Sequence, residues 1–268
     1  MIDPLTRGSI FAETQFEILS ALRSREMLPV TPQNLVGAQK LLDDLLEGVA
    51  ARHREELAPA IERVWNDGIE EIQADLREWL RRAAFDHAGW RPERFELAFG
   101  LRDREQADPA STPEPVRVAG ITLRGSIDLI ERGADGRLRA TDHKTGRVRA
   151  ERGFIIGGGR ILQPVAYALA AKSVLGEEVG TGRLYYCTAA GGYEERIVDI
   201  DDNARASLEA VVATINGALK DAFLPAAPDA DGCKWCDYRR VCGPYAERRT
   251  ARKSKERIAA LLALRARP

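Results

Sequence analysis

Apolar residues recur at helical spacing through the first third of the chain. They form one stripe between Ser9 and Leu19, and Pro29 and Pro32 then interrupt the pattern. From about Gln33 to Phe85 the spacing returns among many charged residues, which predicts two or three helices with solvated outer faces. No chemistry is assigned to these helices, and their histidines at positions 53 and 87 are interpreted as surface residues.

The pattern changes at Trp90, where short apolar runs with turn signals replace the helical stripes. The predicted elements are strands 95–101, 116–131 and 137–143, a helix 162–175, a hairpin of strands 183–188 and 193–200, and a helix 202–222. This order predicts an α/β (α+β) fold in which helices flank a central mixed β-sheet, preceded by a helical N-terminal insertion.

One domain with four parts accounts for this organisation. Residues 1–90 form the opening helix and helical region, and residues 91–224 form the core with the predicted sheet. Pro225 and Pro228 open a cysteine segment at residues 225–244, and residues 245–268 form a basic tail with helical character. The tail is interpreted as a solvated helix, with contact to DNA phosphates as the alternative.

Composition narrows the class of protein. The 268 residues are 44% apolar and 30% charged, which excludes a disordered chain. No apolar run reaches the roughly 20 residues that span a bilayer, and the N-terminus lacks the apolar stretch of a signal peptide, so a cytoplasmic protein is expected. The net charge of −1 excludes a uniformly basic surface but leaves room for a local basic groove.

The chemistry lies in two neighbouring predicted strands. Asp128 stands among apolar residues, where an unpaired carboxylate would be costly. Asp142 and Lys144 flank His143, and alternation along a strand places their side chains on one face. Carboxylate oxygens are the ligands that Mg²⁺ and Mn²⁺ prefer, and a nearby lysine can orient water or neutralise charge on a phosphate. The alternative is an ordinary Asp–Lys ion pair at a strand end.

Further residues support the first interpretation. Glu96 is another acid inside an apolar strand. Gln163 and Tyr167 lie four residues apart on the helix after the Asp-x-Lys strand, so both face the same way.

Together these segments resemble the PD-(D/E)XK nuclease superfamily, and specifically its RecB/AddB-type exonuclease branch, which also includes CRISPR-adaptation nucleases. Residues 7–11 (Arg-Gly-Ser-Ile-Phe) resemble its opening-helix motif, and Glu96 its acidic strand. Residues 125–128 (Gly-Ser-Ile-Asp) resemble its metal-ligand strand, residues 142–146 its Asp-x-Lys-Thr-Gly, and residues 163–167 its Gln-x-x-x-Tyr helix. The resemblance runs from Thr6 to about Pro244 and implies a restriction-endonuclease-like core.

The resemblance also implies roles. Asp128 and Asp142 would bind Mg²⁺ or Mn²⁺ together with the backbone carbonyl of His143, whose side chain should point away. Lys144 would be the catalytic lysine.

Three more residues complete the implied site. Gln163 and Tyr167 would contact DNA or brace the site. Glu96 would be an outer metal ligand or support the ligands.

One position departs from the branch pattern. The opening helix normally carries a metal-binding histidine in Arg-Gly-x-x-x-His-Glu, and Ala12 stands at that position here. Alanine cannot coordinate a metal, so this chain is expected to be impaired or inactive. Ala12 is either a natural loss or a replacement that disables the enzyme, and the intact remainder of the site favours the second.

The C-terminal cysteines form a second constellation. Cys233, Cys236 and Cys242 follow the spacing C-x2-C-x5-C, which resembles the iron–sulfur segment of AddB-type nucleases. There a fourth cysteine upstream of the opening helix completes a [4Fe–4S] cluster, although four thiolates would equally suit zinc. This chain has no cysteine there, so a fragment of a longer protein with an incomplete or absent cluster is expected. Cys187 is interpreted as a buried strand residue.

The sequence therefore predicts a metal-dependent DNA exonuclease domain that hydrolyses phosphodiester bonds. By resemblance it would act on single-stranded ends in double-strand-break processing and recombinational repair, beside a helicase subunit or domain. The alternative is a degenerate nuclease fold that serves as a DNA-end-binding or scaffold module. A zinc-ribbon interaction module would explain only the cysteine segment.

Overall fold

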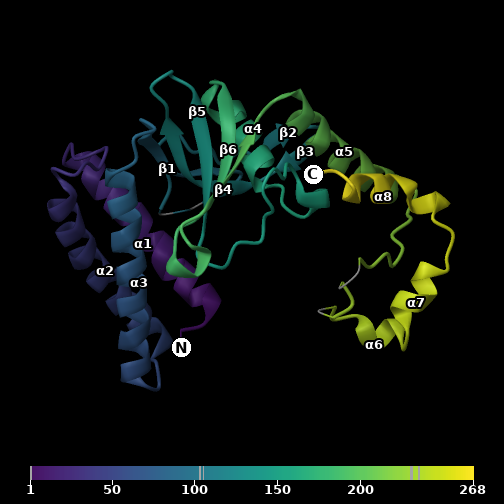
Figure 1. The fold of residues 1–268 in the computed structure, drawn as a ribbon, viewed down its shortest axis with the longest axis horizontal. Helices are drawn as coiled ribbons and strands as arrows, with labels where there is room; N and C mark the ends of the chain where they lie inside the picture. Colours follow the sequence, from purple (N-terminus) through teal and green to yellow (C-terminus); the bar gives the residue numbers. More distant parts are fainter. Residues whose placement is uncertain (1, 103, 105, 230–231, 235) are drawn as a thin grey trace.

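The computed structural model describes residues 2–102, 104, 106–229, 232–234 and 236–268, and Figure 1 shows their arrangement. In this part of the chain a five-stranded sheet has the order β1-β4-β5-β6-β7. Its strands are β1 (Arg91–Phe99), β4 (Gly125–Arg132), β5 (Leu138–Lys144), β6 (Val179–Tyr186) and β7 (Glu195–Asp199). Neighbouring strands are antiparallel except β5 and β6, which are parallel, so the predicted mixed sheet is confirmed.

Helices cover both faces of the sheet (Figure 1). On one face lie α1 (Pro4–Ser24), α2 (Leu35–Leu57) and α3 (Glu62–Ala84), whose apolar stripes bury a core with Phe95 and Leu129 of the sheet. On the other face α4 (Gln163–Leu175) and α5 (Asp202–Lys220) enclose a second core with Leu97, Ile127 and Ala140. We call these the helical core and the main core.

The predicted strand over residues 116–131 is wrong in its extent. The chain instead forms β2 (Val116–Val118) and β3 (Ile121–Leu123), a separate antiparallel pair, before β4 begins. Ala119 and Gly120 form the two-residue turn with φ values of +49° and +89°. Positive φ at both central residues is the geometry of a tight hairpin turn, which the apolar alternation around it concealed.

The interpretation of the tail as a solvated helix is also wrong for its last residues. After α6 (Arg239–Cys242), α7 (Ala246–Ala251) and a short 3-10 turn, α8 (Ala259–Arg265) returns to α5, as Figure 1 shows. Leu264 is buried in the main core. The carbonyl oxygen of Pro268 accepts hydrogen bonds from the N–H groups of Ile156 and Gly157, at 2.8 and 3.1 Å.

A glycine sets how closely α4 approaches the sheet. A Cβ added to Gly182 of β6 would lie 2.1 Å from the carbonyl oxygen of Pro164, in the first turn of α4. We expect Gly182→Ala to destabilise the protein by about 1–3 kcal/mol in denaturant unfolding, because backbone must move to make room.

Gly217 of α5 provides the control, since a Cβ there meets nothing within 4 Å. Gly217→Ala is expected to stabilise by about 0.5–1 kcal/mol through helix propensity. Equal effects of the two variants would contradict the close-approach explanation.

Candidate active site

Glu96 of β1 and Asp128 of β4 lie at the positions where the buried side chains of each strand change from the helical core to the main core. Phe95 and Leu129, which are paired, pack in the helical core, whereas the next pair, Leu97 and Ile127, packs in the main core. Residues two apart on a regular strand share a face, so both strands are irregular at the intervening Glu96 and Asp128. Glu96 has a φ of +52°, a conformation that costs free energy for any residue but glycine.

Asp128 lies at the point where β4 separates from β5. The paired register of these strands ends at Leu129 and Thr141. Beyond it, the backbone N–H of His143 donates a 2.7 Å hydrogen bond to Oδ2 of Asp128. A side-chain carboxylate thus replaces the carbonyl that a continuing strand would supply, and the strands open into a site.

Asp142 and Lys144 of β5 lie on the α4 side of the sheet. Nζ of Lys144 is 2.5 Å from Oδ2 of Asp142. The Asp142 side chain is 9% exposed and that of Lys144 is 34% exposed, so the ammonium reaches solvent while the carboxylate does not. Oδ2 of Asp142 is buried with the Lys144 ammonium as its partner, so a cation at this oxygen would share it with Lys144.

Repulsion among acids shows that the carboxylates converge. Burial raises the pKa of Asp128 well above its usual range, and the nearby charges of Asp142 and Glu96 raise it further. Burial also raises the pKa of Asp142, which Lys144 only partly offsets. Burial and then the same three carboxylates raise the pKa of Tyr167 to about 12, so its phenol stays protonated beside them.

Glu96 and Gln163, the remaining predicted site residues, differ in whether they contact the residues of the site. Glu96 accepts hydrogen bonds from Arg104 at 2.7 Å and from the Ser126 hydroxyl at 2.6 Å, so protein donors already hold its carboxylate. Gln163 lies one turn before Tyr167 at the start of α4, and the described contacts give its amide no partner among the carboxylates.

Helix α1 approaches the end of β5 at the position of the missing histidine. A Cβ on Gly8 would lie 3.7 Å from Oγ1 of Thr145, the residue after Lys144. Ala12 is one turn further along the same face of the helix, and it is exposed. A longer side chain at position 12 therefore has space beside the site.

The imidazole of His143 lies on the opposite face of the sheet, as alternation along the strand predicts. Its ring centroid is 5.9 Å from that of Trp79 and 6.0 Å from that of Tyr185. Burial, followed by the charge of Arg183, lowers the pKa of His143 to about 3, so the ring is neutral near pH 7. It is thus unsuited to exchange protons with substrate.

Sequence reasoning missed Asp75 of α3, which joins three segments around the site. Oδ2 of Asp75 accepts a 2.5 Å contact from the Arg7 guanidinium, and Oδ1 accepts from the Ala189 N–H at 2.7 Å and the Tyr193 hydroxyl at 2.9 Å. The available signal was an acid in the apolar stripe of α3, among residues that are all buried: Ile72, Leu76, Trp79 and Leu80. A buried acid there needs partners from elsewhere in the chain.

The donor set fits a hard divalent cation. Within the described residues, no three His, Cys, Asp or Glu side chains are already arranged as a complete metal site. Mg²⁺, however, commonly takes only one or two carboxylates and keeps several waters. Asp128 and Asp142 supply two mutually repelling carboxylates. A cation bound between them would relieve that repulsion.

Cys187 is buried, as predicted, but it lies one residue beyond the end of β6 rather than within a strand. It is buried in the helical core, and its thiol lies 3.7 Å from the carbonyl oxygen of Lys144. Burial, a hydrogen bond with Glu247 and then the charges of Cys236 and Cys242 raise the pKa of the Cys233 thiol, but among the described residues these groups are not arranged as a metal site.

A mixed sheet with flanking helices and two aspartates beside a lysine defines the class of metal-dependent nucleases with a restriction-endonuclease-like core. The family model of the PD-(D/E)XK nuclease superfamily matches residues 18–243. This match covers most of the chain, and the chain belongs to that superfamily, whose members hydrolyse phosphodiester bonds with divalent metals. No curated protein matches the chain.

Among the described residues, no helix has the length and apolar character needed to cross a membrane.

Repulsion at the site predicts a trade-off between stability and metal binding. The pKa of Asp128 is higher in the folded chain than in the unfolded chain. The fold therefore loses stability as the pH rises from the unfolded pKa to the folded pKa, because the buried carboxylate must ionise. Asp128→Asn is therefore expected to raise the melting temperature at neutral pH without metal. Mn²⁺ at 100 times its Kd should stabilise the wild-type chain by about 2.7 kcal/mol but not the variant. Equal Mn²⁺-induced shifts in calorimetry would contradict Asp128 as a ligand.

Proposed function

We propose that this chain is the DNA exonuclease domain of a RecB/AddB-type helicase–nuclease that processes double-strand breaks in recombinational repair. One observation carries the proposal: Asp128, Asp142 and Lys144 converge at the point where two strands separate, on the side of the sheet that α4 covers. An ordinary ion pair would not require the strained Glu96 or a second, partly buried aspartate beside it.

The residues of the site divide the work of hydrolysis. Asp128 and Asp142, with the carbonyl of His143, would hold a Mg²⁺ or Mn²⁺ ion, and such a cation would supply Lewis-acid polarisation of the phosphate. Lys144 orients the attacking water and offsets the charge that develops on the phosphate. Arg104 and Ser126 fix the Glu96 carboxylate behind the aspartates. Tyr167, which stays protonated, donates a hydrogen bond towards the phosphate oxygens or braces the site with Gln163.

Ala12 accounts for a weakened site. Ala12 lies exposed one turn beyond Gly8 on the same helix face and offers no ligand atom, so we propose that the chain binds its cation weakly and cleaves slowly. This same feature favours the second candidate, a degenerate nuclease fold that binds DNA ends as a module.

Partners and further cofactors follow from the same resemblance. A helicase subunit or domain would feed a single strand to the site. We propose that Cys233, Cys236 and Cys242 contribute to a [4Fe–4S] cluster, because their C-x2-C-x5-C spacing resembles that of the AddB-type segment. A reducing cytoplasm suits cysteines that are all free in this structure.

The deciding experiment uses end-labelled single-stranded DNA with Mn²⁺ or Mg²⁺. It compares the wild-type chain, Ala12→His and Ala12→His with Asp128→Ala, and the products are resolved on a denaturing gel. Cleavage by Ala12→His that Asp128→Ala abolishes supports the nuclease. If no variant cleaves and all bind DNA equally, the binding module replaces it.

A further inference from the structure

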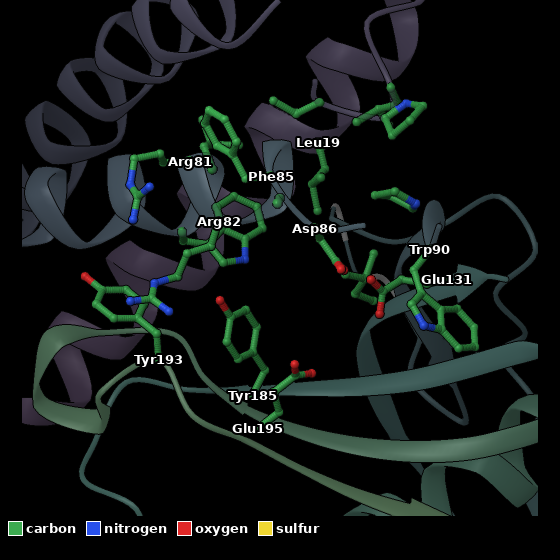
Figure 2. Close-up of a pocket in the computed structure, with 18 of the residues that line it drawn as sticks. Leu19, Arg81, Arg82, Phe85, Asp86, Trp90, Glu131, Tyr185, Tyr193 and Glu195 are labelled. Atoms are coloured by element: carbon green, nitrogen blue, oxygen red, sulfur yellow. The ribbon is translucent and has the colours of Figure 1, made fainter. Parts of the chain in front are cut away.

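A cavity of about 360 Å³ lies on the opposite face of the sheet from the carboxylates. It opens between the end of α3 and strands β4, β6 and β7, and Figure 2 shows its lining. Tyr185 rises from the sheet in the middle, with Trp90 on one side and Tyr193 on the other (Figure 2). This volume is within the range of small-ligand pockets.

Arginines fix the aromatic walls of this pocket. The guanidinium carbon of Arg139 lies 4.2 Å from the ring centroid of Trp90, and that of Arg183 lies 5.0 Å from the ring of Tyr185. Glu131 holds both arginines, through 2.9 Å and 2.7 Å hydrogen bonds. The network thereby sets the positions of both rings in the pocket wall.

The charges of the pocket are balanced. Glu131 is paired with Arg139 and Arg183, and Arg183 is also paired with Glu195 at 2.9 Å. A pocket without excess charge does not select an ion of either sign. Its rings instead favour a planar, uncharged group, since aromatic faces stack on any base.

Hydrogen-bond acceptors remain on both glutamates. Oε2 of Glu131 accepts from three donors, on Arg139, Thr141 and Arg183, but Oε1 accepts only from Arg139. Glu195 accepts from Arg183 through Oε2 alone, and its side chain is 45% exposed. The free acceptors match an N–H₂ group at the edge of a planar ring.

The pocket lies directly behind the catalytic strand. The His143 ring, on the strand that carries Asp142 and Lys144, contacts Trp79 and Tyr185 of the pocket wall. The sheet separates the pocket from the carboxylates, so it does not hold the scissile phosphate. A ligand there belongs to another part of the bound strand.

We propose that this pocket binds a nucleobase with an exocyclic amino group, adenine, cytosine or guanine, from single-stranded DNA. The base stacks against Trp90 and Tyr185, and its amino group donates to Glu131 or Glu195. This inference rests on the proposed function for its ligand, but not on cleavage, because binding needs no metal ion.

The test measures binding of short fluorescent oligodeoxyadenylate and oligothymidylate by anisotropy, with EDTA present. Oligodeoxyadenylate is expected to bind several-fold more tightly, since thymine lacks the amino group. Trp90→Leu and Tyr185→Leu should each weaken its binding about tenfold and remove the preference. Tyr238→Leu is the control, because Tyr238 is 72% exposed on the cysteine segment. Circular dichroism establishes that each variant is folded. If Tyr185→Leu does not fold, Trp90→Leu carries the test, because Trp90 is only half-buried.

Two outcomes would overturn the pocket: equal affinity for both oligonucleotides, or unchanged binding by the folded Trp90→Leu and Tyr185→Leu variants. Asp128→Asn should keep the preference for oligodeoxyadenylate, which separates the two proposals. Base-selective binding without cleavage by Ala12→His supports the pocket and contradicts the nuclease. Cleavage by Ala12→His without base-selective binding supports the nuclease and contradicts the pocket.

Discussion

Ala12→His is expected to cleave single-stranded DNA with Mn²⁺ at least about 100-fold faster than the wild-type chain. Losing a residue that only supports a metal ligand already costs about 10–100-fold, so supplying a direct ligand should have at least the upper effect. The structure leaves space for it, because Ala12 is exposed and shares a helix face with Gly8, beside Thr145. Initial rates over a range of Mn²⁺ concentrations measure the effect, which should include tighter apparent metal binding.

Two controls separate a new ligand from a general effect of histidine. Ala51→His places the same side chain on an exposed position of α2 and should leave the rate unchanged. Ala12→His combined with Asp128→Ala should lose activity, because the remaining ligands do not hold the cation. If Ala51→His is as active as Ala12→His, the histidine acts elsewhere and the assignment of position 12 is wrong.

The second large effect concerns the stability of the fold. Glu131→Gln is expected to lower the free energy of unfolding by about 3–5 kcal/mol, because it leaves the buried guanidinium groups of Arg139 and Arg183 without their shared carboxylate. Urea unfolding at pH 7 measures it. Glu177→Ala is the matched control: it removes a 49%-exposed partner of Arg132 and should cost at most about 1 kcal/mol.

The same glutamate predicts a dependence on pH. Burial alone would raise the pKa of Glu131, but Arg183 and Arg139 outweigh it and lower the pKa to about 2 from its usual 4.5. Because the folded pKa is the lower one, its stabilisation is complete above pH 4.5 and is lost as the pH falls towards 2. The loss amounts to about 3 kcal/mol. Glu131→Gln should lack this part of the acid dependence, and an unchanged slope would contradict the pKa assignment.

The sequence predicted the parts of the site that follow from local rules. Alternation along a strand places Asp142 and Lys144 on one face and His143 on the other, and the structure has this arrangement. The helical spacing of Gln163 and Tyr167 likewise orients both from α4. The sheet, its mixed character and its flanking helices also follow from the order of the predicted elements.

Contacts between distant segments could not be predicted in this way. Asp75 meets Ala189 and Tyr193, more than 100 residues away, and no local pattern encodes that pairing. The passage of β1 and β4 between the two cores depends on the left-handed conformation of Glu96, which an apolar strand pattern conceals. The hydrophobic residues of α8 indicated a helix but not its docking partner.

Because α8 packs against α5, the chain leaves the catalytic domain before the cysteine segment and returns to the same domain after it. Leu264 and the hydrogen bonds of Pro268 hold the far end independently of any bond between the cysteines. A single proteolytic cut between Pro225 and Lys255 would therefore yield two fragments that remain associated until the protein is denatured. The cysteine segment could thus be exchanged, lengthened or cut without removing α8 from its place beside the sheet.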